Sequence, residues 1–215
     1  MIIIAAVKYP RSARTVSHDD VVPSLLRSGA RYCLVLRPFG QDTRIVLPKL
    51  NKKGRPAENF LYTRNVTVEQ VITTAARSVL GVRTYGIVDQ RTAFAAPGPT
   101  WMRTADDHWQ SVVLRLIQDA HVIVLIVPPE QELGDGFLWE VEQIRCCARA
   151  ARVIIVIPCD ERDQPHVAAL RRARVLLAML DSDVDRVAER RVLVADRTYP
   201  RALADAMRGI DHEHS

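Results

Sequence analysis

The chain is predicted to be an α/β protein: a doubly wound, flavodoxin-like, parallel five-stranded sheet with helices on both faces. From residue 32 onward, short runs rich in valine and isoleucine alternate with segments of helical periodicity. Two of these runs, 121–127 and 152–157, are apolar almost throughout, which is typical of strands covered by helices on both faces. The 215 residues, 48% of them hydrophobic, are enough to bury the core of such a domain.

Five strands follow from the β-branched runs and from the proline or polar residues that end them. The first ends at Pro38, and the fourth ends at Pro158. They cover residues 32–37, 82–89, 121–127, 152–157 and 191–195. Two further segments are weaker candidates: a short strand at 44–47 within a long connection, and an edge strand at 2–7. We assign the whole of 90–103 to a loop because it contains Pro97-Gly98-Pro99.

Helices are expected at 67–80, 109–120, 137–150, 165–180 and 199–207. Thr67 and Gln70 have the spacing of a capping box, and Gly81 is a suitable C-terminal stop. Asp106 or Asp107 is expected to cap the second helix, and Asp135 the third. The domain therefore spans 32–210, with an N-terminal extension at 1–31 and a frayed tail at 211–215.

Composition excludes several classes of protein. The longest apolar runs are far shorter than the roughly 20 residues of a membrane span, and residues 1–7 lack the features of a secretory signal. We therefore expect a soluble, cytoplasmic protein without a membrane span. The four cysteines form no CxxC pair, so reduced thiols are expected.

The net charge of +5 comes mainly from arginines that are scattered among acidic residues. Nucleic acid is therefore not an expected partner. The six histidines are dispersed and none pairs with cysteine at metal-binding spacing, so no metal site is predicted. The sequence also lacks the phosphate-loop, dinucleotide, zinc-helix and nucleophile-elbow motifs.

In open α/β sheets, ligands bind beyond the carboxyl ends of the strands. This rule selects a set of candidates: Arg37, Phe39 and Asp42 after the first strand, Asp89 after the second, the loop around Gly98, residues 128–136 after the third strand, and residues 159–160 after the fourth.

Glu140 stands out because it lies in the first turns of the helix that follows 128–136. Two interpretations stay open: a carboxylate that reaches a ligand, or the ordinary preference of acidic residues for helix N-termini. Trp139 is similarly either a packing residue at the rim or a platform for a base.

Four short motifs occur in the same order as in a known group of proteins. They are 36–42 (LRPFGQD), 106–110 (DDHWQ), 120–125 (AHVIVL) and 136–140 (GFLWE). The succession resembles a set of bacterial TIR-like proteins with the patterns LRxF..D, DDxWQ, A..IVL and GLLWE. These are related to Toll/interleukin receptor (TIR) domains and to nucleoside deoxyribosyltransferases. Glu140 matches the G-x-x-[FW]-E pattern of the transferases, whereas TIR domains space the tryptophan and the glutamate further apart.

The resemblance implies a nucleotide N-glycosidase that cleaves NAD to nicotinamide and ADP-ribose upon self-association, with NAD as substrate and no separate cofactor. Glu140 would be the catalytic carboxylate. The other roles implied are phosphate binding by Arg37, ribose binding by Asp89, base stacking by Trp101 or Trp109, and closure of the Gly98 loop over the nucleotide. For Arg37 an ion pair with Asp42 or Asp106 is the alternative, and for Trp109 it is packing at the start of a helix.

Two other functions fit the same resemblance. One is a catalytically silent TIR-like signalling or interaction module, in which the crevice binds a nucleotide or nothing. The other is a deoxyribosyltransferase-like enzyme, which keeps Glu140 as nucleophile but needs a second base as acceptor.

Overall fold

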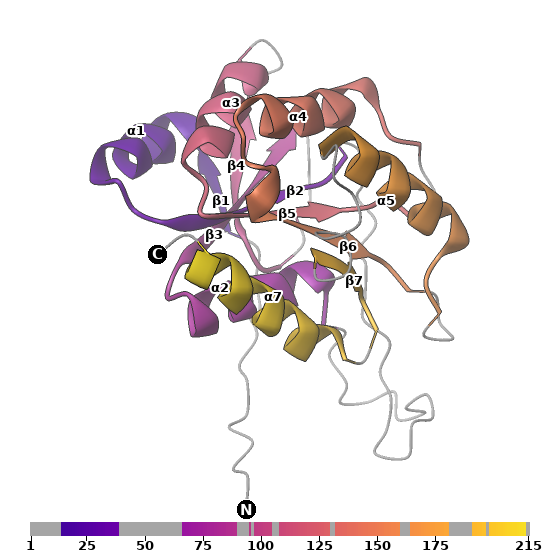
Figure 1. Ribbon diagram of the computed structural model, residues 1–215. Helices are drawn as coiled ribbons and strands as arrows, with labels where there is room; N and C mark the ends of the chain where they lie inside the picture. The colour runs from indigo at the N-terminus through magenta and orange to yellow at the C-terminus, as the bar shows by residue number, and fades with distance from the viewer. Residues whose placement is uncertain are drawn as a thin grey trace, which may run out of the picture.

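The computed structural model describes residues 14–38, 66–89, 95, 97–104, 108–129, 132–159, 164–180, 191–196 and 198–213. A parallel sheet lies between two layers of helices (Figure 1). In chain order the elements are β1 (Arg14–Ser17), α1 (His18–Ser28), β2 (Tyr32–Leu36), α2 (Val68–Val79), β3 (Arg83–Asp89), β4 (Thr100–Thr104), α3 (Trp109–Asp119), β5 (Val122–Ile126), α4 (Asp135–Cys146), the 3₁₀ turn η1 (Ala150–Arg152), β6 (Val153–Ile157), α5 (Val167–Leu180), β7 (Val192–Val194) and α7 (Tyr199–Glu213).

Within the described ranges the sheet has seven strands in the order β1-β4-β3-β2-β5-β6-β7, and every neighbouring pair is parallel. The α/β class and the parallel sheet are confirmed, but the expected number of five strands is wrong. The five predicted strands are all present as β2, β3, β5, β6 and β7. Numbered among themselves they follow the order 2-1-3-4-5, which is that of flavodoxin-like sheets. The two additional strands, β4 and β1, extend the sheet beyond β3.

Both additional strands lack the pattern that identified the others. β4 has the sequence TWMRT and directly follows a Pro-Gly-Pro segment, so its polar residues and its position favoured a loop. β1 is a short strand, RTVS, and is mostly exposed at the sheet edge. Pairing with β3 and β4, which the local sequence does not encode, makes these segments strands.

Helix α1 also falls within the predicted N-terminal extension. Pro23 inside this helix weakens its helical pattern. Its start is nevertheless capped by the Ser17 side chain, and Gly29 ends it in the left-handed conformation at φ 60°. Val22 and Leu25 of α1 are buried in the same core as the sheet. The weaker strand candidates at 2–7 and 44–47 lie outside the described residues.

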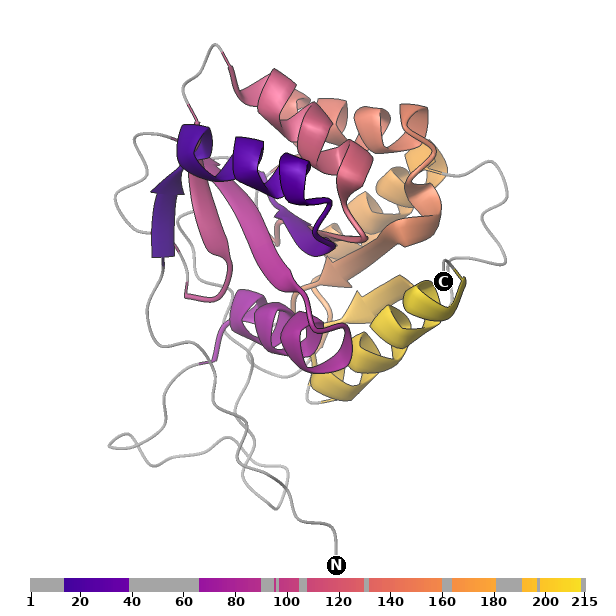
Figure 2. The same cartoon turned by 90° about the vertical axis from the view of Figure 1, so that its left-hand side faces the viewer.

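Alternate residues of the strands supply two large hydrophobic cores, one on each face of the sheet. Figure 2 shows the two layers of helices that cover these faces. Leu34, Leu36, Ile123 and Ile155 belong to the core under α1, α3, α4 and α5. Cys33, Val35, Val124 and Ile154 belong to the core over α2 and α7. We call these sides the α4 face and the α2 face. No helix in the described ranges is both long enough and apolar enough to cross a membrane.

The helix ends match the sequence analysis in part. The capping box of α2 is confirmed, with the Thr67 hydroxyl accepting from Gln70 N–H and the Gln70 side chain accepting from Thr67 N–H. Asp106 and Asp107, one of which is predicted to cap the next helix, lie outside the described residues, and the cap predicted for α4 is wrong. His108 precedes α3, and Gly134 precedes α4, so Asp135 is instead the first residue of α4 and lies beside the positive end of its dipole. Helix α7 continues beyond its predicted end to Glu213.

The contact between β3 and β4 generates a prediction about Gly86. A Cβ atom at Gly86 would lie 2.6 Å from Trp101 Cε3, whereas one at Gly209 in α7 would meet nothing within 4 Å. We expect Gly86→Ala to lower the free energy of unfolding by about 1–3 kcal/mol through overpacking. Gly209→Ala is expected to raise it by up to about 1 kcal/mol. Urea denaturation checks both values, and equal effects of the two substitutions would contradict the packing described.

Candidate functional site

The order of the strands places the candidate site between β2 and β5. The connection after β2 passes to α2 on one face, and the connection after β5 passes to α4 on the other. In doubly wound sheets this reversal opens a crevice at the carboxyl ends of the two strands. Arg37 directly follows β2, and Glu140 lies on α4, so these two predicted residues come from the two elements that flank this position.

Arg37 is buried on the α2 face, where it contacts two side chains. Its Nη1 donates a hydrogen bond of 3.1 Å to Glu69 Oε1, and its guanidinium carbon lies 4.7 Å from the centre of the Trp101 ring. The side chain of Arg37 is 6% exposed, and that of Glu69 is fully buried. Arg37 therefore forms an internal ion pair, which is the alternative stated above, but its partner is Glu69. Asp42 and Asp106, the partners considered from the sequence, lie outside the described residues.

Glu69 lies in the first turn of α2, where the helix dipole favours a negative charge. Burial raises the pKa of this carboxyl, and the Arg37 guanidinium opposes that rise. Glu69 Oε1 accepts from Arg37, but Oε2 is buried without a hydrogen-bond partner within the described part of the chain. The buried Tyr199 hydroxyl of α7 is likewise unpaired there, and burial followed by the charge of Glu69 raises its pKa.

The loop around Gly98 lies against the start of α2. Thr67 Oγ1 donates a hydrogen bond of 3.2 Å to the Pro97 carbonyl. Gly98 has φ 140°, and a Cβ atom there would lie 2.6 Å from the Glu69 carbonyl oxygen. Both the backbone conformation and the close approach therefore require glycine at this position. Gly98 therefore contacts the backbone of Glu69, and Arg37 contacts its side chain.

Trp101 is fully buried in the same group, against Gly86 and Arg37. Its indole therefore has no exposed face to offer a base in this structure. We call Arg37, Glu69, Gly98 and Trp101 the arginine cluster.

Glu140 is a carboxylate on the core-facing side of α4. The buried residues of this helix are Phe137, Glu140, Val141 and Ile144, which follow the spacing of an apolar stripe. Glu140 is 1% exposed, and its Oε2 has no hydrogen-bond partner among the described residues. Burial raises its pKa well above the ordinary value. Glu140 therefore occupies a position where an apolar residue would stabilise the fold.

Glu142 lies two residues further along α4, on a different face of the helix, and has the opposite environment. It is exposed and accepts a hydrogen bond of 2.9 Å from Arg145 Nε. This contact with Arg145 lowers the pKa of Glu142. The two glutamates show that α4 holds one carboxylate in the interior and pairs the other at the surface.

The tryptophans before and within this region pack against each other. The rings of Trp109 and Trp139 lie edge to face with their centres 5.1 Å apart, and both residues are half-buried. Trp109 also lies over Gly136, where a Cβ atom would be 3.5 Å from its ring. This pair joins the starts of α3 and α4 and corresponds to the packing alternative for both residues.

The structure therefore gathers the predicted residues into two groups on opposite faces of the sheet. Arg37, Gly98 and Trp101 lie together on the α2 face, and Glu140 lies near the tryptophan pair on the α4 face. Asp89 is the last residue of β3 and pairs with Thr104 in register. Phe39 and Asp42 lie outside the described residues.

Glu69 is not among the residues predicted from the sequence, because no local signal reveals its role. It lies between Thr67 and Gln70 of the capping box, where an acidic residue is common for helical reasons alone. Its importance comes from Arg37, which is remote in sequence. Tyr199 was missed for a similar reason, because its burial depends on the packing of α7 beside α2.

No group of three or more potential metal-binding side chains occurs within the described ranges. Comparison with known proteins adds no relative: no family model matches the chain, and neither a curated protein nor a solved structure is significantly similar to it.

The buried ion pair predicts an asymmetric response to mutation. Arg37→Met would leave the Glu69 carboxyl in the interior without its cation, and we expect a loss of about 3–5 kcal/mol in unfolding free energy. Adding Glu69→Gln to Arg37→Met should recover much of the lost unfolding free energy. Arg145→Met is the matched control, because the Arg145–Glu142 pair is exposed, and it should change stability by about 0.5 kcal/mol or less. Similar losses for Arg37→Met and Arg145→Met in chemical denaturation would refute the assignment.

The raised pKa of Glu140 predicts a pH-dependent cost of keeping this residue. Above about pH 4.5, the ordinary value, the unfolded chain releases a proton that the folded protein retains on Glu140. The folded state therefore loses stability as pH rises towards its own, higher pKa. Glu140→Gln has no such proton, so it should be more stable than the native protein at pH 7, with the difference shrinking as pH falls towards 4.5. Thermal unfolding across this range tests the prediction. Glu142→Gln serves as the control. A stability difference between Glu140→Gln and the native protein that does not change with pH would contradict the prediction.

Proposed function

We propose that this protein is a TIR-like nucleotide N-glycosidase, with NAD as the candidate substrate and Glu140 as its catalytic carboxylate. The observation that carries the proposal is the environment of Glu140. A carboxyl group 1% exposed and unpaired among the described residues reduces stability, and it lies on α4, which flanks the crevice position of the sheet. Side chains that reduce stability in this way are commonly retained for function.

Hydrolysis of NAD⁺ requires few catalytic groups besides the Glu140 carboxylate. In the hydrolysis of NAD⁺, the bond between the nicotinamide nitrogen and the ribose carbon breaks, and the bonding electrons leave with nicotinamide as a neutral molecule. Water then supplies the hydroxyl of ADP-ribose and releases a proton. The ribose becomes positively charged in the transition state, and an ionised carboxylate beside it lowers the barrier.

The low polarity around Glu140 makes a cationic substrate a suitable partner. An isolated carboxylate in the interior gains more from a nearby positive charge than one in water does. A bound nicotinamide ring, which carries such a charge, would favour ionisation of Glu140 and so prepare it for the transition state. Arg37, which the resemblance assigns to the phosphates, is paired with Glu69 on the opposite face of the sheet, so the proposal rests on Glu140 and not on Arg37.

Access to Glu140 requires a rearrangement of the carboxyl edge. The side chain is 1% exposed, and the indole pair of Trp109 and Trp139 joins the adjacent helix ends. We therefore propose that the single chain is inactive and that self-association opens the site, as the TIR resemblance implies.

A second candidate is the catalytically silent interaction module. It is favoured by one specific observation, the engagement of Arg37 with Glu69, which leaves the arginine committed to an internal partner. In this alternative Glu140 is a buried structural residue, and the helix faces mediate association.

Purified protein incubated with NAD⁺ over a range of protein concentrations tests the proposal, with chromatography to detect nicotinamide and ADP-ribose. We expect the rate per molecule to rise with concentration. Glu140→Gln should lower this rate at least about a hundredfold, while Glu142→Gln should leave it unchanged.

Each other outcome has a definite meaning. Activity that persists in Glu140→Gln would remove Glu140 from the mechanism. The absence of nicotinamide release at every concentration would favour the silent module. Exchange of bases between a deoxynucleoside and an added free base, without hydrolysis of NAD⁺, would identify the transferase alternative.

A further inference from the structure

Basic residues mark the amino ends of the strands. In the order of the sheet they are Arg14 (β1), Arg83 (β3), Arg31 (before β2), His121 (before β5), Arg152 (before β6) and Arg191 (before β7). In the βαβ units the helices end at this same edge, so their free carbonyl groups and negative dipole ends also lie here. A row of arginines at this edge is thus expected on structural grounds.

Most of these arginines are engaged within the protein. Arg152 Nη1 donates a hydrogen bond of 3.2 Å to the Ala120 carbonyl at the end of α3. Arg191 donates to the Ala151 carbonyl and pairs with Glu213. Arg31 pairs with Asp211, whose Oδ1 lies 2.9 Å from His121 Nε2. These contacts tie the end of α7 to the sheet.

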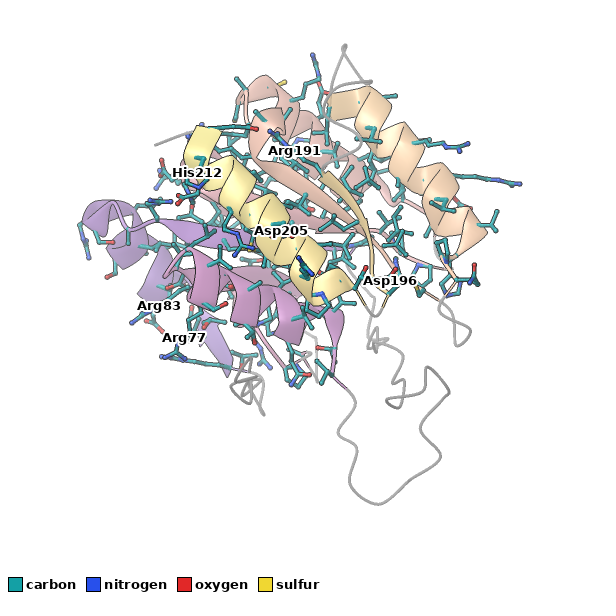
Figure 3. The ribbon with its side chains drawn as sticks, turned by 60° about the horizontal axis from the view of Figure 1, so that its bottom comes forward. Arg77, Arg83, Arg191, Asp196, Asp205 and His212 are labelled. Atoms are coloured by element: carbon teal, nitrogen blue, oxygen red, sulfur yellow. The ribbon has the colours of Figure 1, made fainter. Side chains whose placement is uncertain are left out.

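Arg14 and Arg83 differ from the others, because neither has an ion pair or a side-chain hydrogen bond with any described residue. Both are exposed, and both line the same cavity. Figure 3 labels Arg83, at the start of β3, and Arg77, in the last turn of α2.

The cavity lies between α1 and the amino ends of β1, β4 and β3, and its volume is about 480 Å³. Strand register explains why the two arginines meet there. Thr100 is paired with both Arg14 and Tyr85, and Tyr85 belongs to the core on the α4 face. Arg83 precedes Tyr85 by two residues, so both arginines project to the same face as Tyr85. From the spacing of strands, their Cα atoms are about 12 Å apart, within reach of two arginine side chains that share one anion.

The remaining lining residues describe the shape and chemistry of the cavity. Small residues, Ser24, Ser28, Ala30 and Gly81, leave space at its border. Its walls include the apolar side chains of Val21, Leu25 and Tyr85. Its charged lining residues are Arg14, Arg31, Arg83 and Asp20, so the lining is positive overall. A volume of this size is typical of sites for small organic molecules.

We propose that this cavity is a binding site for a small organic anion, a carboxylate or phosphate monoester with an apolar body. The anionic group would lie between Arg14 and Arg83, since the planar guanidinium matches these oxyanions. The apolar body would lie over Leu25 and Tyr85. The site is at the amino ends of the strands, opposite the crevice position of the proposed glycosidase, and it does not depend on that function.

Equilibrium binding of anilinonaphthalene sulfonate, an anion with an aromatic body, tests the site through its fluorescence. We expect one saturable site per chain that weakens as salt is raised. Arg14→Gln and Arg83→Gln should each weaken binding about tenfold. Ser24→Phe, which places a ring at an exposed border position of the cavity, should abolish it. Arg77→Gln is the matched control, because it removes the same charge from the same end of the molecule without touching the cavity, and it should change binding less than about twofold.

Competition then identifies the preferred anion. Displacement of the probe by adenosine monophosphate indicates a phosphate monoester, and displacement by hexanoate indicates a carboxylate. Failure of both to displace it would overturn the proposal. So would equal affinities of Arg14→Gln, Arg83→Gln and Arg77→Gln, or unchanged binding in Ser24→Phe. Thermal unfolding of each variant verifies that its fold is retained.

Discussion

The ion pair of Arg37 and Glu69 connects β2 to α2 inside the protein, at the carboxyl edge of the sheet. Its guanidinium also lies over Trp101 of β4, and the backbone of Glu69 supports Gly98 in the loop before that strand. A charge pair without solvent is stable only while both members remain in place, because either one alone would be an unpaired charge in a medium of low polarity. The ion pair therefore joins β2, α2 and β4 at this edge through residues that are distant in the sequence.

Glu140 is a second buried carboxylate, but its Oε2 has no hydrogen-bond partner among the described residues. Burial is the largest influence on both carboxyls and raises the pKa of each, but at Glu69 the Arg37 guanidinium opposes the rise, whereas at Glu140 no charge in the described ranges opposes it. One sheet thus carries an ion-paired acid on the α2 face and, on the α4 face, an acid whose raised pKa is opposed by no ion pair in that part of the chain. Perturbed acids of this second kind are concentrated in functional sites, although structural positions also contain them.

Sequence patterns predicted those parts of the molecule that are determined locally. The apolar runs of β5 and β6 and the capping box of Thr67 and Gln70 were identified because each pattern lies within one element. β4 was assigned to a loop because its strand character comes from pairing with β3 and β1. Arg37 was identified as a candidate, but its partner could not be, because Glu69 is adjacent to it only in the folded chain. The arginines that are scattered along the sequence are similarly gathered at the strand starts by topology alone.

Trp109 and Trp139 form a close aromatic pair on the α4 face of the sheet. Two indoles arranged edge to face at 5.1 Å are close enough for their electronic transitions to interact, so the pair contributes a distinctive circular dichroism signal. The third tryptophan, Trp101, is fully buried beside Arg37 on the other face. The chain thus carries native tryptophans on both sides of its sheet, and circular dichroism can follow separation of the starts of α3 and α4 without any attached label.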